Sequence, residues 1–531
     1  MVLEYAQDLM IIDAGLMFPE NDMLGIDLVI PDMTYILERA DKVRGVVITH
    51  GHEDHTGGLP YLLNKLRVPV YSTRLTEGLI AVKLKEHKLL EGTSLNIIQP
   101  GDELNLGAFR VEFFAVSHSI PDGVGLAVHT PVGTVVHSGD FKLDHTPVDG
   151  KLTDFPKLAR LGAQGVLLFF SDSTRAEIPG YTPSESVIGL AMERVIGEAK
   201  GRVLVATFAS LISRVQQVID AAVKHDRKVA VVGRSMVNNV RMATEMGYLQ
   251  VPPGTLVKAE DVSHLPPDQV VIVITGSQGE PTSVLTRLAT GDHKQLHIHP
   301  GDTVLISASA IPGNEQLVHR TIDNLFKKGA NVIWQDIAQV HVSGHGSQEE
   351  LKMMINLVRP KYFVPVHGEY RQLTMHARLA ESLGIPEDNT FVLENGQVLE
   401  VGPNSARVVN KVPAGYVYVD GLGVGDVSHV VLRDRRALAQ DGILVVVIAV
   451  DGQTGKIASR PDIVSRGFVF MRESDELIEE ARDLVTSNLD HGADRLAEWG
   501  FINNKIKDVL SRFFYERTKR RPMILPVVVE V

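Results

Sequence analysis

The sequence contains no cysteine among its 531 residues. Disulfide bonds and thiolate metal sites are therefore excluded, and a cytoplasmic location is expected. The sequence also lacks any apolar run of about 18 residues and any signal-peptide pattern, so no association with a membrane is expected. If the protein binds a metal, histidine and carboxylate side chains must supply the ligands.

The sequence has no excess of positive charge. Its 53 Lys and Arg residues are outnumbered by 65 Asp and Glu residues, which leaves a net charge of −12 at pH 7. A generally basic nucleic-acid-binding surface is thereby excluded. Should nucleic acid be the substrate, a local positive surface and bound metals must attract its phosphates. The apolar fraction of 44% is ordinary, and the length suits about two to four domains.

The most informative segment is HGHEDH, residues 50–55, which follows an apolar, strand-like run and precedes a predicted helix. His50 and His52 alternate on an extended backbone and therefore point the same way. Asp54 and His55 come after the bend at which the helix begins. One pair can hold one cation and the other pair a second cation beside it. A polar loop with incidental histidines is the alternative interpretation.

Three further candidate ligands, His118, Asp140 and His367, each follow an apolar, strand-like run. Gly139, directly before Asp140, allows close approach of the backbone. A single histidine at a strand end is more often structural. Three such residues in this order after an HxHxDH segment resemble the signature of the metallo-β-lactamase superfamily, and that resemblance implies that they are partners in one metal site.

The spacing of strand-like and helix-like segments predicts three domains. Residues 1–182 mix strands with crossover helices, which favours an αββα sandwich. Residues 183–344 alternate regularly, which is typical of a parallel sheet with helices on both faces. The predicted strands of this block are Val203–Ala206, Val229–Val232, Val270–Ile274, Val304–Ser307 and Val332–Trp334.

The order of the candidate ligands implies that residues 183–344 are an insertion. His367 comes after this block, so the first domain must resume, over residues 345–425. Residues 426–437 are predicted to be a short charged linker. Residues 438–531 are predicted to form a small α+β domain with a strand at Ile443–Val450, two helices and a closing strand at Ile524–Val531.

This arrangement resembles the β-CASP branch of the metallo-β-lactamase superfamily and, within it, the ribonuclease J family. The resemblance covers nearly the whole chain and rests on seven motifs in family order. They are Asp13 in IIDAGLMFP, the segment HGHEDHTGG, His118, Asp140 in HSGDFK, Asp172 in SDST, His341 in HVSGHGS and His367 in PVHGEY. The resemblance implies a metallo-β-lactamase sandwich with an inserted β-CASP domain. Family members usually have an earlier strand before the one that ends at Asp13, so one sheet edge is expected to be incomplete.

The resemblance also assigns two divalent metal ions to these ligands. One would be held by His50, His52 and His118. The other would be held by Asp54, His55 and His367, with Asp140 bridging the two. Asp13 would orient the loop histidines through hydrogen bonds. Nitrogen and oxygen donors suit Zn²⁺, and Mn²⁺ is also compatible with them.

Phosphodiester hydrolysis needs a strong nucleophile and neutralisation of charge at phosphorus. Two metals about 3.5–4 Å apart would activate a shared water and bind a phosphate oxygen, so that hydroxide attack would leave 5′-phosphate products. His341 is the candidate general acid, with Asp172 keeping it protonated and oriented. These two residues and the ligand Asp54 form the predicted catalytic set. A structural histidine and a helix N-cap are the respective alternatives for His341 and Asp172.

The resemblance implies a cytoplasmic ribonuclease with 5′→3′ exonuclease and endonuclease activity, acting in RNA maturation, including rRNA processing, and in mRNA decay. Its implied partners are single-stranded RNA with a 5′-monophosphate end, further copies of the chain in a homodimer or homotetramer, and proteins of an RNA-degradation complex. Ser210, Ser343, Gly344 and His345 are the candidates for binding the 5′ phosphate, through backbone N–H groups, hydroxyls and an imidazole.

Two other functions would use part of the same sequence pattern. A small-molecule metallo-hydrolase, such as a lactonase or thioesterase, shares the HxHxDH segment but needs no inserted domain carrying Asp172 and His341. A non-catalytic RNA-binding paralogue is expected to have lost some ligands, whereas all seven are present here.

Overall fold

The computed structural model describes the chain except residues 21, 281, 311–313, 336, 452–456, 469–474 and 491–498, and it leaves the side chains of 490 and 499–502 undescribed. Two compact units are present. One comprises Met1–Met17 and Ile30–Tyr416, and the other comprises Phe18–Val29 and Val417–Val531. Among the described helices, none combines the length and the apolar character needed to cross a bilayer.

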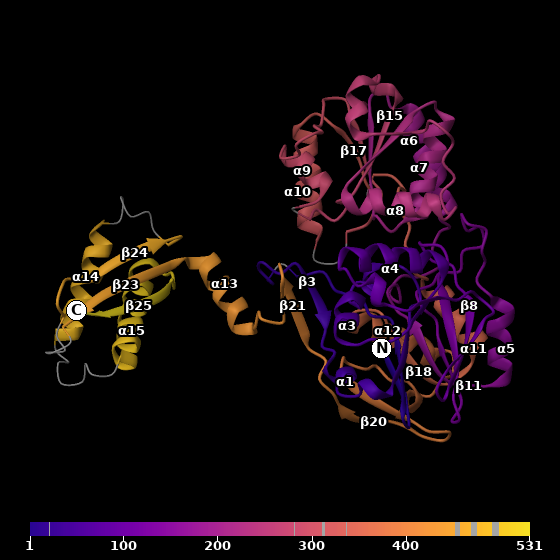
Figure 1. The fold of residues 1–531 in the computed structure, drawn as a ribbon, viewed down its shortest axis with the longest axis horizontal. Coiled ribbons are helices and arrows are strands. Elements are labelled where there is room, and N and C mark those ends of the chain that lie inside the picture. Colours follow the sequence, from indigo (N-terminus) through magenta and orange to yellow (C-terminus); the bar gives the residue numbers. More distant parts are fainter. Residues whose placement is uncertain are drawn as a thin grey trace. The chain divides into compact units, whose positions relative to one another are not determined.

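The first unit contains two facing sheets with helices on their outer sides, as the sequence predicts (Figure 1). One sheet has the order β1-β2-β4-β5-β6 and the other has the order β18-β11-β10-β9-β8-β7. The strands are β1 Val2–Tyr5, β2 Asp8–Ile12, β4 Val43–Val47, β5 Val70–Ser72, β6 Leu95–Ile97, β7 Glu103–Leu106, β8 Phe109–Ala115, β9 Val124–His129, β10 Thr134–His137, β11 Val166–Asp172 and β18 Pro360–Val366. The helices are α1 Thr34–Leu37, α2 Glu53–Thr56, α3 Leu59–Lys65, α4 Arg74–Glu86, α5 Phe155–Gln164, α11 Gln348–Val358 and α12 Tyr370–Ser382, and a hairpin of β19 Gln397–Val401 and β20 Ala406–Lys411 follows.

Buried apolar residues on the strands explain why these sheets stack. One face of each contributes to a shared core that includes Met10, Val47, Phe113 and Leu126, all at most 1% exposed. At the edge that the family resemblance left open, β1 pairs antiparallel with β2. The strands therefore bring the ends of β2, β4, β10, β11 and β18 to the region where the candidate ligands lie.

The inserted domain has one fully parallel sheet with the order β14-β13-β15-β12-β16-β17, and helices cover both of its faces (Figure 1). Its strands are β12 Val203–Ala206, β13 Lys228–Val232, β14 Leu256–Val257, β15 Val270–Ile274, β16 Thr303–Ile306 and β17 Asn331–Ile333. Its helices are α6 Ser186–Glu198, α7 Ile212–Lys224, α8 Arg234–Glu245, α9 Val284–Thr290 and α10 Glu315–Lys327. The strands are almost uniformly apolar because both faces are buried, which is why they were readable from the sequence.

A buried ion pair joins α7 to the start of the inserted domain. Arg214, which is 1% exposed, lies 2.6 Å from a carboxylate oxygen of Glu185 and donates to the carbonyl of Val340 at 3.1 Å. It also donates to the Ser307 hydroxyl at the end of β16. Lys142 lies 4.0 Å from the other oxygen of Glu185. Arg214 is thus the closest cation to a carboxylate that is 4% exposed.

Replacing Arg214 with methionine is expected to lower the free energy of unfolding by about 3–5 kcal/mol, since Glu185 would remain buried without its closest cation. Differential scanning calorimetry or urea unfolding measures the loss. The matched control is Arg194→Met, because Arg194 and Glu198 form an ion pair whose side chains are 78% and 69% exposed. That change should cost at most about 1 kcal/mol. A loss for Arg214→Met as small as the control's would contradict the prediction.

The second unit contains the sheet β24-β23-β25 and most residues of the sheet β22-β21-β3. Its elements are β3 Leu28–Pro31, β21 Tyr416–Asp420, β22 Gly423–Val424, α13 His429–Asp441, β23 Ile443–Val450, β24 Asp462–Arg466, α14 Asp475–Asp490, α15 Trp499–Thr518 and β25 Met523–Glu530. Residues 426–437, predicted to be a linker, lie mostly within α13. Their charges are not simply solvated, because Arg435 pairs with Asp420 and donates to the carbonyl of Leu24.

Candidate metal centre

The HGHEDH segment lies where β4 ends and α2 begins. His52 is the extended residue directly before the helix, with φ −71° and ψ 157°, and Asp54 and His55 lie within its single turn. Gly15 lets this turn pack closely, because a Cβ at that position would lie 1.5 Å from the backbone oxygen of Asp54. His50 precedes the bend, so the two pairs of side chains leave the backbone on either side of it, as their spacing predicts.

Three imidazole nitrogens converge beside this segment. Nδ1 of His52 lies 3.1 Å from Nε2 of His50 and 3.2 Å from Nε2 of His118. Nδ1 of His118 donates to the carbonyl of Gly344 at 2.8 Å, and Nδ1 of His50 lies 3.1 Å from the hydroxyl of Thr49. Nε2 of His50 and Nε2 of His118 therefore carry no hydrogen in the neutral rings, and both face the same point as Nδ1 of His52. A tetrahedral Zn²⁺ with Zn–N bonds of about 2.0–2.1 Å holds its nitrogens about 3.3 Å apart.

Burial keeps these three imidazoles neutral. It is the largest cause that lowers the pKa of His50 and His118 well below the ordinary value and the pKa of His52 to about 4. Neighbouring imidazoles lower each pKa further, because two positive rings this close would repel each other. Neutral imidazole is the form that binds a metal ion.

A second cluster consists of Asp54, His55, Asp140 and His367. Oδ2 of Asp140 lies 3.2 Å from Nε2 of His55 and 3.2 Å from Nε2 of His367. Oδ2 of Asp54 lies 3.7 Å and 3.8 Å from the same two nitrogens. The Asp140 oxygen is also 3.7 Å from Nε2 of His50, so it lies between the two clusters.

Asp13 supports both clusters through Thr49 and His55. Its carboxylate accepts the backbone N–H of Thr49 at 2.7 Å, the Thr49 hydroxyl at 2.9 Å and Nδ1–H of His55 at 2.8 Å. Burial alone would raise the pKa of Asp13, but His55 and these hydrogen bonds outweigh it and lower the pKa. The tautomer and orientation of His55 are thereby set, with Nε2 facing Asp140.

The residues present fit two divalent cations. Nε2 of His55 is buried and has no hydrogen-bond partner in the described structure. Burial would lower the pKa of His55, but Asp140, Asp13 and Asp54 outweigh it and raise that pKa well above its ordinary value. A cation at this point would take the place of the ring proton, satisfy the orphaned nitrogen and be balanced by the carboxylates. The donors are imidazole nitrogens and carboxylate oxygens, which suit Zn²⁺.

A third feature of the site is a hydrogen-bonded pair of Asp172 and His345. Oδ2 of Asp172 lies 2.7 Å from Nδ1 of His345, and that nitrogen is 3.9 Å from Oδ2 of Asp140. Burial lowers the pKa of His345, but Asp172 outweighs it and raises the pKa to about 9. His345 is therefore protonated at neutral pH and adjoins both clusters, which is the arrangement that a proton donor requires.

The predicted pairing of Asp172 with His341 is wrong, because Asp172 pairs with His345. Nδ1 of His341 is buried without a hydrogen-bond partner. Burial and then the positive charges of Arg214, Lys142 and Arg175 lower the pKa of His341 to about 3. A ring held neutral in this way cannot donate a proton at neutral pH. The sequence could not separate the two histidines of HVSGHGS, since residues 339–346 form neither helix nor strand whose periodicity would show which one faces the site.

The four residues predicted to bind a 5′ phosphate have different surroundings. The Ser343 hydroxyl accepts the backbone N–H of His345 at 3.1 Å, so these two lie together. Gly344 contributes its carbonyl to His118, and a Cβ there would lie 2.5 Å from the His118 ring. Ser210 lies in the turn before α7, and the hydrogen bonds of the described residues do not join its side chain to Ser343 or His345.

Sequence reasoning missed Glu350, which ties three parts of the site together. Its buried carboxylate accepts the backbone N–H groups of Leu143, Thr182 and Ser347 at 2.8, 2.6 and 2.8 Å. Leu143 follows Asp140 in the chain, Thr182 precedes the inserted domain, and Ser347 follows His345. The capping-box pattern of Ser347 and Glu350 was a readable signal, although it predicts only the start of α11.

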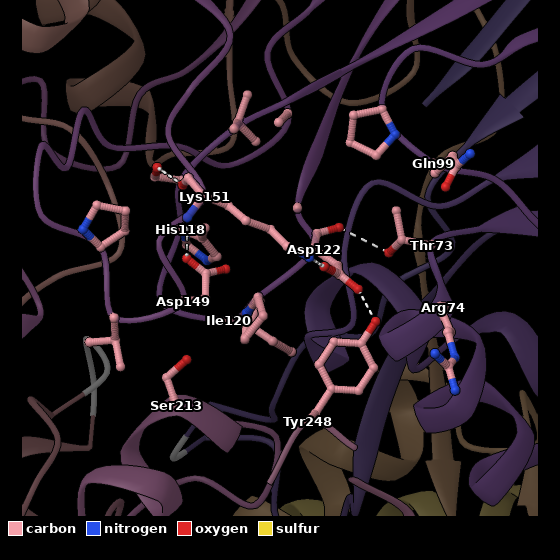
Figure 2. A pocket seen from close by; sticks show the side chains of 18 of the residues that line it. Thr73, Arg74, Gln99, His118, Ile120, Asp122, Asp149, Lys151, Ser213 and Tyr248 are labelled. Atoms are coloured by element: carbon pink, nitrogen blue, oxygen red, sulfur yellow. Dashed lines mark hydrogen bonds and ion pairs between the residues drawn. The ribbon is translucent and has the colours of Figure 1, made fainter. Parts of the chain in front are cut away.

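A cavity of about 310 Å³ opens beside His118 (Figure 2). Residues of the first domain line most of it, and Glu185, Ser213 and Tyr248 of the inserted domain line the rest. Asp122 bonds to both Lys151 and the Tyr248 hydroxyl. Burial and this carboxylate raise the pKa of Tyr248. The cavity therefore offers room for a ligand next to the first cluster, at the junction of the two domains.

Models of four protein families match successive parts of the chain. The metallo-beta-lactamase superfamily matches residues 1–182, and the ribonuclease J beta-CASP domain matches residues 200–325. The Zn-dependent metallo-hydrolase RNA specificity domain matches residues 329–392, and the ribonuclease J C-terminal domain matches residues 430–531.

Whole proteins are similar along nearly their full length. Ribonuclease J2 of Bacillus subtilis is 46% identical over 100% of this chain and 96% of its own length. Ribonuclease J of Thermus thermophilus is 46% identical over 100% of this chain and 92% of its own length. Ribonuclease J 1 of Streptococcus pyogenes is 45% identical over 99% of this chain and 94% of its own length. A solved structure of a protein of unknown function from Enterococcus faecalis superposes with a TM-score of 0.52 at 16% identity, covering 77% of this chain and 96% of that one. This last likeness concerns the fold alone.

Proposed function

Because this chain belongs to the ribonuclease J family, we propose that it is a metal-dependent ribonuclease that hydrolyses RNA at the centre formed by its two ligand clusters. One observation carries the proposal. The protonated His345 and its partner Asp172 adjoin a complete set of nitrogen and oxygen ligands, so an acid and two cation sites occupy one place.

The seven ligands divide into two sets under this proposal. His50, His52 and His118 would hold one cation, and Asp54, His55 and His367 would hold the other, with Asp140 shared. When bound, the cations supply Lewis acidity toward a phosphate oxygen and lower the pKa of a water molecule. Asp13 keeps His55 in the tautomer that presents Nε2. Zn²⁺ is the cation that this donor set favours, and Mn²⁺ is the alternative.

His345 is the proposed general acid in place of His341. Its proton would pass to the 3′ oxygen of the leaving nucleotide, and the product would keep the 5′ phosphate. Asp172 holds the ring through Nδ1, which leaves Nε2–H as the group available to the substrate. Burial would raise the pKa of Asp172, but His345 is the chief cause of its being lowered instead. That carboxylate therefore stays charged at neutral pH.

We further propose the finer properties that the family resemblance implies. These are 5′→3′ exonuclease activity with endonuclease activity, preference for a 5′-monophosphate end bound near Ser343, a role in RNA maturation and decay, a cytoplasmic location and assembly into homodimers or homotetramers. We also propose the domain boundaries after residues 182, 344 and 425. Ser210, in the turn before α7, remains a proposed member of the phosphate pocket.

The test is to incubate purified protein and Zn²⁺ or Mn²⁺ with internally labelled RNA that carries either a 5′-monophosphate or a 5′-hydroxyl. Release of labelled mononucleotides, faster from the monophosphate and abolished by EDTA, is the expected result. Turnover of a lactone without RNA cleavage would favour a small-molecule hydrolase. RNA binding without cleavage under all metal conditions would favour a non-catalytic relative.

A further inference from the structure

We propose that Thr174 is a positioning residue that holds the carboxylate of Asp172 and the backbone of His367 in one fixed arrangement. The inference rests on the proposed function, because it gives these two residues roles in acid catalysis and metal binding. Thr174 itself touches neither substrate nor metal under this proposal. It acts through the two residues that it joins.

The contacts of Thr174 restrain one oxygen of Asp172. Its backbone N–H and its hydroxyl lie 3.0 Å and 2.9 Å from Oδ1 of Asp172. The other oxygen, Oδ2, faces Nδ1 of His345 at 2.7 Å. A carboxylate held at Oδ1 cannot rotate freely, so Oδ2 stays directed at His345. The orientation of His345, the proposed general acid, therefore depends on Thr174.

The same hydroxyl also reaches the metal-ligand side of the site. It lies 2.9 Å from the backbone carbonyl of His367. His367 has a φ of +55°, a left-handed conformation that residues other than glycine rarely adopt and that surrounding contacts must hold. Its ring nitrogen lies 3.2 Å from Asp140. The hydroxyl therefore helps to fix the backbone from which one ligand of the second cluster extends.

The topology explains why one side chain can reach both residues. Strands β11 and β18 are parallel neighbours, with Asp172 opposite Val366. Thr174 and His367 consequently follow adjacent strand ends. Helix α12 holds this junction from the other side, since Gln372 donates to the carbonyl of Thr174 at 2.8 Å and its side-chain oxygen accepts the N–H of Glu369.

A neighbouring contact anchors the same turn. The Ser173 hydroxyl lies 2.9 Å from Nδ1 of His376, a fully buried ring on α12 whose pKa burial lowers to about 3. The contact of Ser173 with His376 therefore fixes the turn against α12, and the Thr174 hydroxyl supplies the contacts to Asp172 and His367. A threonine hydroxyl has a single hydrogen, and here two acceptors, Asp172 Oδ1 and the His367 carbonyl, lie at equal distance from it. Loss of the hydroxyl weakens both restraints at once.

The test compares Thr174→Val, which keeps the shape but removes the hydroxyl, with Thr174→Ser, which keeps the hydroxyl. For Thr174→Val we expect kcat on 5′-monophosphorylated RNA to fall about tenfold with KM within about twofold, as for a misplaced catalytic group. We also expect Zn²⁺ affinity, measured by competition with a chelating dye without RNA, to fall about tenfold, a change typical of residues that support ligands. Thr174→Ser should restore both.

Thr374→Val is the matched control, since Thr374 lies on α12 with an exposed hydroxyl that bonds only within its own helix. It should change neither quantity. Wild-type values for Thr174→Val would overturn the proposal. Equal defects in Thr174→Ser and Thr174→Val would also overturn it, because they would trace the effect to packing of the methyl group. The Zn²⁺ measurement needs no RNA, so failure of the proposed ribonuclease activity would be seen separately, in the wild-type assay.

Discussion

Replacement of His345 with glutamine is expected to lower kcat for RNA hydrolysis about 10²–10⁴-fold, the range that a positioned proton donor supplies. The reason lies in the pair with Asp172, which raises the pKa of His345 to about 9 and directs the ring at the centre. The proposed ligands remain in the variant, so metal content measured by mass spectrometry should stay near the wild-type value.

Two comparisons make this prediction specific. His341→Gln should retain kcat within about threefold, because burial and nearby cations already keep that ring neutral, with a pKa of about 3. An RNA with sulfur in place of the 3′ bridging oxygen has a leaving group that needs no proton. On that substrate the gap between His345→Gln and wild type should shrink at least about tenfold. A larger loss from His341→Gln than from His345→Gln would return the acid role to His341.

Replacement of Asp140 with asparagine is expected to lower kcat/KM at least about 10³-fold and to reduce the Zn²⁺ bound per chain. Its Oδ2 lies 3.2 Å from two imidazole nitrogens of the second cluster and 3.7 Å from one of the first. No other carboxylate among the described residues adjoins both clusters so closely. A metal contributes several kcal/mol of transition-state stabilisation, and each 1.36 kcal/mol is about tenfold in rate.

The control for Asp140→Asn is Glu53→Gln in the HGHEDH segment. Glu53 forms an ion pair with Lys83 on α4, and its side chain is 46% exposed. The activity and metal content of the Glu53→Gln variant should stay within about twofold of wild type, since exposed ion pairs contribute little to stability. Full Zn²⁺ occupancy with unaltered affinity in Asp140→Asn would remove Asp140 from the proposed ligands.

Much of the fold was predictable because strands that are buried on one or both faces leave apolar runs that are readable in the sequence. The predicted strands Val203–Ala206, Val270–Ile274 and Ile443–Val450 have those same bounds in the structure. The αββα sandwich with an inserted parallel sheet is confirmed. Elements that are short or mostly exposed gave no such signal. The segment Phe18–Val29, which belongs with the second unit, and helix α13 were both missed for this reason.

The site, like the fold, has a part that the sequence predicted and a part that it did not. Its candidate ligands follow strand ends or share one six-residue segment, so chain order and spacing, together with the family resemblance, predicted which residues would gather. The proton donor lies in an irregular segment with two histidines four positions apart. Only packing puts Asp172 beside His345 and three cations around His341.

The sequence by itself determined the fold class, the set of candidate ligands and the exclusion of thiolate or disulfide chemistry, because periodicity, spacing and composition are local properties of the chain. The tertiary structure alone decided which histidine carries a proton and how Thr174, Glu350 and Arg214 support the site. These properties depend on burial and on charges from residues distant in the chain, such as Asp172 with His345 and Lys142 with His341. No local pattern encodes those distances.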